Sequence, residues 1–413
     1  MEKFAENFAF FELVKYVSFR IFELTERLFW CIIIVDIFSS AKKSSTRRPK
    51  MKANKILLIL TGGTICSFTT SKGEQAPDVE RAKALIVQKF RESDSPYRGE
   101  ECTQFSVVSP LDILSENMTV LHWNTLIREL RTYDFSLYDG VVILHGTDTL
   151  AYTAAMLSVI LSGLQIPVIL VSSQLALANP NANGTANVKA AVELIANGIQ
   201  PNVYVTYRNE EGYGRALTKT MYVHYAAHLL QCAIRSNNFY SCDMTPISTE
   251  NAVFEGTKSL GEKPLLYDPH FNGLFACVLK IDPYVGLDYS KLSLIGIDAI
   301  IHGTYHSSTV ETNPNIKEVD CSHYSIIHLK KMCDQHTPPI SLFIEPYVKT
   351  TYESTGEVLR AGIMPIKDLT SEMAYVKTLI GCSLGYRGVD LQNYLHHNVN
   401  NEHLPPHAEA DAY

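Results

Sequence analysis

Two short polar clusters in the sequence carry side chains that can do acyl-transfer chemistry. The first is Thr61–Ile65, read TGGTI, and the second is His145–Thr149, read HGTDT. Each follows an apolar run, Lys55–Leu60 and Val141–Leu144 respectively, of the kind that forms a strand covered on both faces of a parallel sheet. Ligands bind at the carboxyl ends of such strands, so the two clusters are expected at the ligand-binding edge of one sheet.

The side chains of these clusters suit hydrolysis through a covalent threonine ester. The hydroxyl of Thr64 is a weak nucleophile by itself and needs a base or a proton relay. Lys219, in a predicted polar loop over residues 208–220, can serve as that base when it is desolvated. Asp148 can orient this lysine or anchor a substrate ammonium.

The backbone of the two clusters can stabilise negative charge. N–H groups around Gly63 and Gly146 can bind a carboxylate or a developing oxyanion. There are plainer alternatives for the neighbouring side chains. Thr147 and Asp148 can simply cap the helix that follows, and Lys219 can be a solvated lysine.

A third polar loop, Asp112–Met118, lies between a predicted strand over Cys102–Pro110 and a predicted helix. Its polar residues Asp112, Ser115, Glu116 and Asn117 make it a third candidate site loop, and a simple capping turn is the alternative. Residues 66–80 directly follow the Gly-Gly turn and are polar. They are expected to form either a lid over the site or an ordinary strand-to-helix connection.

The composition predicts an α/β protein that works in the cytoplasm. The chain has 413 residues, enough for two domains. Its formal net charge of -7, without long acidic blocks, argues against a nucleic-acid-binding surface. Alternating strand and helix patterns predict a mostly parallel sheet with right-handed crossovers. Nine scattered cysteines, with no C-x-x-C pair, indicate a reduced, cytosolic setting.

Shifts in composition predict the domain boundaries. Residues 1–50 are unlike the rest and are expected to be an appended, disordered extension or the result of an upstream start in the gene model. Their apolar run is too short to span a bilayer, and a short membrane-associating helix is the alternative. Residues 51–255 and 272–388 are predicted to form two α/β domains, joined by a linker over residues 256–271. Residues 389–413 are predicted to be a disordered tail whose histidines bind metal at most adventitiously.

As a pair and at this separation, the TGGTI and HGTDT motifs resemble the two signature motifs of the bacterial-type L-asparaginase (asparaginase/glutaminase) family, of the cytosolic type I-like kind. Segments Ser115–Met118, Leu217–Thr220 and Thr370–Lys377 fit the same family in order. The resemblance covers about residues 51–381. It implies a larger N-terminal α/β domain, with a mostly parallel sheet flanked by helices, and a smaller C-terminal α/β domain.

The resemblance also implies the reaction: hydrolysis of L-asparagine to L-aspartate and ammonia, with no metal and no organic cofactor. The residues that match the family's catalytic set are Thr64 as the nucleophile, with Thr147, Asp148 and Lys219 as its proton relay. Asp148 would also bind the substrate α-ammonium, and Ser115 and Glu116 match the loop that binds the α-carboxylate and ammonium, beside Gly63 and Gly146. Family active sites lie between subunits, so a homodimer or homotetramer is expected, with no nucleic acid and no membrane for residues 51–413.

Three features depart from the family pattern. Many members carry a tyrosine in the lid, whereas residues 66–80 have none, which leaves Thr69, Thr70 or Ser71 as substitutes. The segment His302–Ser308 stands where many members have a Gly-Asn pair, and residues 1–50 match nothing in the family.

Other functions stay open on these residues. The same chemistry can release ammonia from L-glutamine for a partner enzyme, which requires room for one more methylene. A catalytically silent member can bind amino acids as a sensor, an alternative motivated by the missing lid tyrosine. A nucleotide-binding Rossmann-type protein has only the fold in its favour, because the sequence has no G-x-G-x-x-G and no G-K-[ST] motif.

Overall fold

The computed structural model divides the chain into two units, residues 1–52 and 53–413. It describes residues 53–212, 217–248, 250, 252–313, 319–348 and 352–405. The prediction for residues 1–50 therefore lies outside the described residues. A search of the described helices found no segment with the length and hydropathy of a membrane span.

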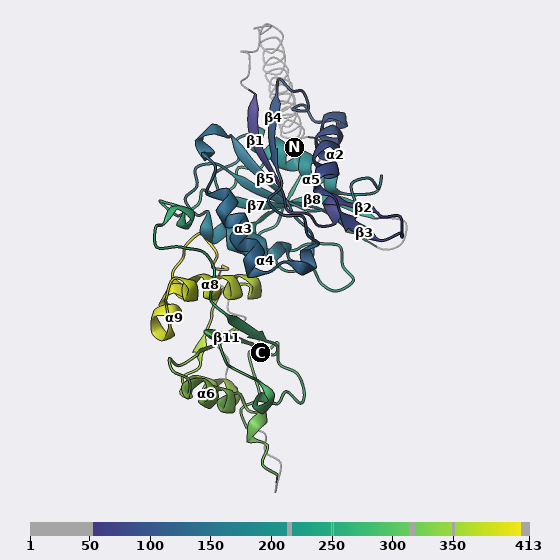
Figure 1. Cartoon of the computed structure of the whole chain (residues 1–413). Coiled ribbons are helices and arrows are strands. Elements are labelled where there is room, and N and C mark those ends of the chain that lie inside the picture. The colour runs from purple at the N-terminus through teal and green to yellow at the C-terminus, as the bar shows by residue number, and fades with distance from the viewer. Residues whose placement is uncertain are drawn as a thin grey trace, which may run out of the picture. The chain divides into compact units, whose positions relative to one another are not determined.

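A seven-stranded sheet, in the order β4-β1-β5-β6-β7-β8-β9, forms the larger half of the second unit (Figure 1). Its parallel strands are β4 (Thr103–Val108), β1 (Asn54–Leu60), β5 (Gly140–Leu144), β6 (Val168–Val171) and β7 (Val203–Glu211). The last two strands, β8 (Thr218–Tyr225) and β9 (Thr245–Ile247), pair antiparallel. The prediction of a mostly parallel sheet is confirmed.

Helices cover both faces of this sheet, as the apolar strand sequences require. In β1, Ile56 and Leu58 belong to one core, together with α2 (Val79–Glu92) and α5 (Gly184–Ala196). Leu57 and Ile59 point the other way, into a second core with helices α3 and α4. Their bounds are Val120–Leu130 for α3 and Leu150–Ile160 for α4.

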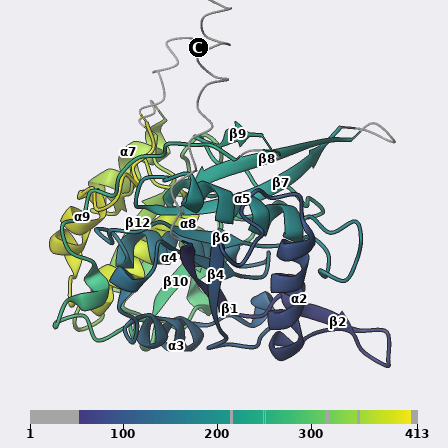
Figure 2. The ribbon, with the colours of Figure 1, turned by 90° about the horizontal axis from the view of Figure 1, so that it is seen from above.

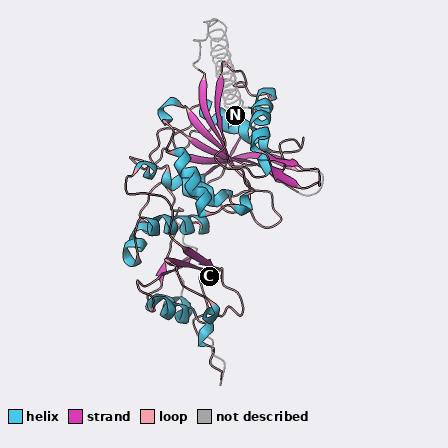
Figure 3. Ribbon diagram, viewed as in Figure 1, coloured by secondary structure: helices cyan, strands magenta, loops and turns pink. Residues whose placement is uncertain are grey.

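A second, four-stranded parallel sheet follows in the order β10-β11-β12-β13 (Figure 3). Its strands are β10 (Val278–Ile281), β11 (Ala299–Gly303), β12 (Ser341–Glu345) and β13 (Met364–Pro365). The helices of this part are α6 (Ile326–Asp334), α7 (Glu353–Arg360), α8 (Ser371–Ser383) and α9 (Gly388–His396). The predicted fold class, a larger mostly parallel sheet with a smaller α/β domain, is therefore confirmed.

Helices α4 and α8 join the two sheets. Tyr152 on α4 and Tyr375 on α8 meet edge to face, with ring centroids 5.8 Å apart, and both helices contribute to one continuous core. Residues 256–271 run along this junction, where Leu266 and Phe271 are buried in the same core. The sheets lie on either side of the predicted linker, and its exact boundaries stay a prediction.

Two sequence predictions are wrong. The polar loop predicted over residues 208–220 is largely a hairpin, because β7 continues to Glu211 and β8 begins at Thr218. The disordered tail predicted over residues 389–413 is also wrong as far as residue 405, the last one described there. Helix α9 buries Leu391 and Leu395, and Glu402 is completely buried.

A buried ion pair fastens this C-terminal segment to α8. Lys377 on α8 pairs with Glu402, and neither side chain is accessible to solvent. The Lys377 ammonium also donates to the carbonyl of Leu395, at 3.1 Å. The Glu402 carboxylate in turn accepts from the backbone N–H groups of Val399 and Asn400. Removing either partner of such a buried, fully hydrogen-bonded ion pair leaves an uncompensated charge in the interior and strongly destabilises the fold.

We expect Lys377→Met to lower the free energy of unfolding by about 3–5 kcal/mol, because it leaves the Glu402 carboxylate buried without a counter-charge. The double variant Lys377→Met/Glu402→Leu removes both charges and should recover most of that loss. Urea unfolding followed by circular dichroism measures both. Lys331→Met, on the exposed side of α6, serves as the control. Its free energy of unfolding should stay within about 0.5 kcal/mol of the value for the unmodified chain. A single variant as stable as this control would contradict the expectation.

Candidate active site

The two threonine motifs meet in the structure through their glycines. Gly63 has a φ of 75°, and a Cβ built on it would lie 2.3 Å from the Cα atom of Gly146. A Cβ built on Gly146 would lie 2.3 Å from the hydroxyl oxygen of Ser115. No side chain fits at either position. The loops after β1 and β5 and the loop that holds Ser115 therefore converge at one point, which brings the Thr64 and Thr147 loops together.

Strand register explains this convergence. Leu60, the last residue of β1, pairs with Leu144, the last residue of β5, so both loops leave the sheet at the same edge. Figure 2 shows β7 and β8 of the same sheet running out beyond it as a hairpin. The Thr61 hydroxyl donates to the Leu144 carbonyl at 2.9 Å. The N–H of Gly63 donates to the Ile113 carbonyl at 2.7 Å, which fastens the third loop to the first.

Ser115 and Asp148 are bound to each other. The Ser115 hydroxyl donates to the Asp148 carboxylate at 3.0 Å and accepts from the Asp148 N–H at 3.1 Å. The Thr149 hydroxyl donates to the Ser115 carbonyl at 2.9 Å. Helix α4 has Thr149 as its N-cap and no side-chain cap bond. Thr147 and Asp148 therefore do not act as a helix cap, and the Asp148 side chain holds the third loop.

The two threonines of the cluster are accessible. Thr64 and Thr147 are half-buried, and neither hydroxyl has a hydrogen-bond partner among the described residues. Asp148 and Glu116, which follow Thr147 and the buried Ser115, are exposed. The three converging loops thus carry two half-buried threonines and two exposed carboxylates.

Lys219 lies on β8 of the hairpin, half exposed, with its Nζ 3.4 Å from a carboxylate oxygen of Glu210 on β7. Through β6 and β7, Leu144 of β5 is in register with Val223 of β8. Lys219 is therefore three strands across from β5, or about 14 Å at about 4.8 Å per strand. It lies beyond the sheet edge from which the threonine loops leave. Its place in the relay stays a prediction, and it requires the ammonium to turn from Glu210 toward Asp148.

A buried polar chain behind the cluster positions the Gly146 carbonyl. The His145 Nδ1 lies 2.8 Å from that carbonyl, so this nitrogen must carry the hydrogen. Nε2 then accepts from the Thr153 hydroxyl at 3.0 Å. The Thr153 oxygen in turn accepts from the Trp123 indole N–H at 3.0 Å. Every member is satisfied only when His145 is neutral.

Burial enforces that neutral state, because it lowers the pKa of His145 to about 4. The smaller sheet repeats the pattern: the Nδ1 of His302 lies 2.7 Å from the Gly303 carbonyl, and burial also lowers the pKa of His302 to about 4. Sequence reasoning did not assign a role to His145. Its place as the first residue of the HGTDT motif could have marked it as part of the site.

Gln231 connects the cluster to the smaller domain. Its side-chain amide donates to the backbone carbonyl of Asp148, and its backbone N–H donates to the Glu372 carboxylate of α8 at 2.9 Å. Glu372 lies in the segment Thr370–Lys377, which resembles the family. Nothing in the sequence singled out Gln231, because its contact with Asp148 joins residues 83 positions apart.

Residues 67–77 form a hairpin of β2 (Ser67–Thr69) and β3 (Gln75–Pro77). The Thr69 hydroxyl accepts from the Gln75 amide at 2.8 Å, and the Thr70 hydroxyl accepts from backbone N–H groups of the turn. These two substitutes for the missing lid tyrosine are therefore engaged inside the hairpin. Ser67 is instead tied to the glycine turn, because its hydroxyl donates to the Gly63 carbonyl at 2.9 Å.

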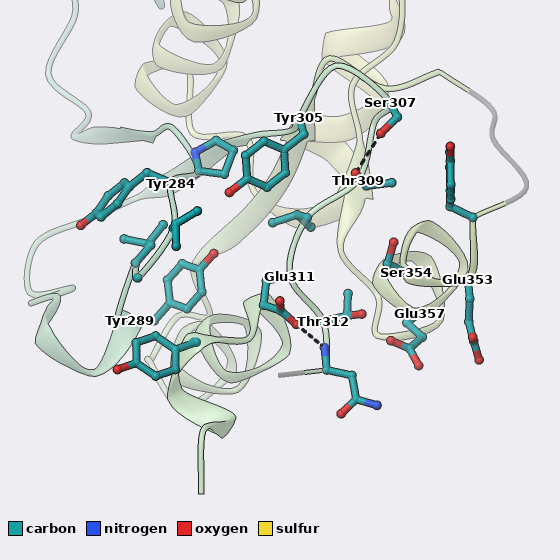
Figure 4. A pocket seen from close by; sticks show the side chains of 18 of the residues that line it. Tyr284, Tyr289, Tyr305, Ser307, Thr309, Glu311, Thr312, Glu353, Ser354 and Glu357 are labelled. Carbon is teal, nitrogen blue, oxygen red and sulfur yellow. Dashed lines mark hydrogen bonds between the residues drawn. The ribbon is translucent and has the colours of Figure 1, made fainter. Parts of the chain in front are cut away.

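A cavity of about 850 Å³ lies in the smaller domain, away from the threonine cluster (Figure 4). Figure 4 shows tyrosines and carboxylates around it, including Tyr284, Tyr289, Tyr305, Glu311 and Glu357. Its lining contains no residue of the three converging loops. This cavity is therefore separate from the threonine cluster.

The chain is similar to known proteins in sequence and in fold. Residues 55–236 match the family model described as "Asparaginase, N-terminal". An L-asparaginase of Thermococcus kodakarensis is 26% identical over 330 residues, covering 79% of this chain and 92% of that protein. A component of the glutamyl-tRNA(Gln) amidotransferase of Methanococcus maripaludis is 28% identical over 350 residues, covering 81% of this chain and 76% of that protein.

Solved structures share the fold. The thermostable L-asparaginase from Thermococcus kodakarensis superposes with a TM-score of 0.65 at 22% identity, over 85% of this chain and 99% of that one. L-asparaginase I from Vibrio cholerae superposes with a TM-score of 0.63 at 22% identity, over 86% of this chain and 100% of that one. The described part of the chain thus has the two-domain asparaginase fold. These comparisons confirm the resemblance to the asparaginase family and support amidohydrolase activity.

We expect His145 to stay a neutral, Nδ1-protonated ring from pH 8 to pH 5, because its pKa is lowered to about 4. In the unfolded chain the ring takes up a proton near pH 6.5. The unfolded state therefore binds more protons below that pH, and this residue should reduce the free energy of unfolding by about 3 kcal/mol as the pH falls from 6.5 to 4.

Nitrogen NMR of ¹⁵N-histidine-labelled protein measures the ring state directly, with the His145 signal assigned by its loss in His145→Gln. The exposed His270 supplies the reference for a solvent-accessible ring. A His145 signal that becomes doubly protonated above pH 6 would contradict the buried network.

Proposed function

We propose that this protein hydrolyses L-asparagine to L-aspartate and ammonia through a threonine acyl-enzyme. The observation that carries the proposal is the contact between Gly63 and Gly146, which sets the Thr64 and Thr147 loops side by side. The match of residues 55–236 to the asparaginase family model and the L-asparaginase relative support the substrate. The pair of accessible hydroxyls supports the acyl-enzyme.

In the first step, the Thr64 hydroxyl oxygen attacks the side-chain amide carbon of asparagine. The C–N bond breaks, the ester bond forms, and the hydroxyl proton leaves with the nitrogen as ammonia. Thr147 and Asp148, on the adjoining loop, are the groups we propose to pass that proton, and Lys219 joins them when its ammonium turns away from Glu210.

The substrate's α-substituents are assigned to the same loops. Asp148 and Glu116 supply negative charge for the α-ammonium, and both are exposed at the cluster. Ser115 supplies a hydroxyl for the α-carboxylate, held in place by its bonds to Asp148.

In the second step, water attacks the ester carbon, the bond to the Thr64 oxygen breaks, and aspartate leaves as the hydroxyl regains its proton. Both steps pass through an oxyanion. Backbone N–H groups around Gly63 and Gly146 are the proposed donors, and one such donor lowers the barrier by roughly 3 kcal/mol.

We further propose that the protein acts in the cytoplasm as a homodimer or homotetramer. A structural neighbour is described as a probable cytoplasmic L-asparaginase from Campylobacter jejuni, with a TM-score of 0.59 at 19% identity. The oligomer is proposed from the family resemblance alone. Sedimentation of the full chain distinguishes monomer, dimer and tetramer.

A second candidate function is release of ammonia from L-glutamine for a partner enzyme. The relatives that belong to glutamyl-tRNA(Gln) amidotransferases favour it, because one of them aligns with 81% of this chain. One extra methylene changes transition-state binding by only about 1–3 kcal/mol. The two substrates must therefore be compared by measurement.

We expect the full chain to release ammonia from L-asparagine, and Thr64→Ala to lower this rate by at least about a thousandfold, because the variant lacks the nucleophile. Thr132→Ala, an exposed threonine just after the end of α3, is the matched control and should keep the activity. Coupled detection of ammonia with each amide gives the rates. Faster release from glutamine would favour the second candidate, and calorimetric binding without release would favour an amino-acid sensor.

We expect Lys219→Ala to lower kcat at least about a hundredfold, because a positioned acid–base group contributes typically 10²–10⁴-fold. Glu210→Gln removes only the carboxylate that pairs with Lys219, whose side chain is half exposed. Because exposed ion pairs contribute little, the kcat of this variant should stay within about tenfold of the unmodified chain. Thr147→Ala should lose activity as severely as Thr64→Ala. The ammonia assay compares these variants. An unchanged kcat in Lys219→Ala would confine the relay to Thr147 and Asp148.

A further inference from the structure

A cluster of three potential metal ligands lies beside β8 and β9, outside the threonine site. His228 ends the short helical turn Ala226–His228 that follows β8. Cys242 and Asp243 lie one residue before β9, which pairs antiparallel with β8 at Val223. This pairing brings a nitrogen, a sulfur and an oxygen ligand together from two segments of the chain.

The cluster is compact and incompletely satisfied. One ligand atom from each of the three residues lies within 4.8 Å of the other two. The His228 Nδ1 is 2.7 Å from a carboxylate oxygen of Asp243. Among the described residues, the His228 Nε2 and the second Asp243 oxygen are buried without a hydrogen-bond partner. The His228 side chain is only 9% exposed, so its free nitrogen has little access to water.

The donor set selects the metal. Mg²⁺ and Ca²⁺ prefer oxygen ligands alone, whereas Zn²⁺ accepts thiolate, imidazole and carboxylate in one tetrahedral site. Bond lengths of about 2.0–2.3 Å to these ligands place the ligand atoms roughly 3.3–3.6 Å apart. Side-chain rotations that move the ligand atoms by about an ångström bring the present cluster, whose ligand atoms lie within 4.8 Å of one another, to that spacing. Cys242 is exposed, which leaves an approach for the ion.

We propose that His228, Cys242 and Asp243 form a Zn²⁺ site of three protein ligands with a fourth position open to water. The site is separate from the threonine cluster and does not rest on the proposed hydrolysis. Its connection to that cluster runs along the chain, because Gln231, three residues after His228, contacts the Asp148 carbonyl.

Metal binding at this site must release a proton. Cysteine binds zinc as the thiolate, whereas a free cysteine thiol is mostly protonated near neutral pH. On binding, the S–H bond breaks, a sulfur–zinc bond forms, and the proton passes to the buffer. The expected stoichiometry is one thiol proton per zinc ion.

The experiment titrates the reduced, chelator-treated full chain with Co²⁺ and then with Zn²⁺. Co²⁺ should give the visible bands of a tetrahedral site and a thiolate-to-cobalt charge-transfer band, and Zn²⁺ should displace it at one ion per chain. Cys242→Ser should lose the charge-transfer band, and Cys242→Ser and His228→Gln should each weaken Zn²⁺ binding at least about tenfold. The matched control, Cys277→Ser, changes another exposed free cysteine and should bind like the unmodified chain.

Calorimetry of Zn²⁺ binding in buffers of different ionisation enthalpy counts the released proton and needs no variant. No saturable binding of one ion per chain would overturn the proposal. So would binding that Cys242→Ser and His228→Gln leave unchanged, because the ion would then sit on other side chains. Circular dichroism of each variant shows that any loss of binding is not a loss of fold.

Discussion

The site depends on one close approach between two backbones. Gly63 and Gly146 lie so near each other that a carbon added to Gly63 would come within 2.3 Å of the opposite chain. Any side chain would push the loops apart and separate Thr64 from Thr147. Glycine is thus required here by space, and at Gly63 also by its positive φ. The equal end points of β1 and β5 make this approach possible.

Buried polar groups hold the two loops in that position from behind. Trp123, Thr153 and neutral His145 form a chain of hydrogen bonds that ends on the Gly146 carbonyl. In a medium of low dielectric constant such a chain is stiff when all its members are satisfied, and costly to break. From the other side, Gln231 ties Asp148 to Glu372, so α8 of the smaller domain also supports the site.

The sequence predicted the parallel strands and the sheet edge that the motifs share, and it failed at two places for identifiable reasons. The strands β7 and β8 extend beyond the sheet core as a hairpin rich in polar residues, so the segment around Lys219 reads as a loop. The tail reads as polar because α9 has few apolar positions, although Leu391 and Leu395, four residues apart, lie on one helix face and are buried. The ion pair that buries Glu402 leaves no local pattern at all.

By itself, the sequence determined the buried strands, the two motifs at their carboxyl ends and the family resemblance. These depend on local properties: continuous apolar runs, glycines at sharp turns and residue types in fixed order. Only the tertiary structure decided which polar side chains meet. Lys219 pairs with Glu210, and His228 approaches Cys242 and Asp243, because strand register and hairpin length set those contacts. Strand register depends on packing between distant segments, so it cannot be predicted from any single stretch of sequence.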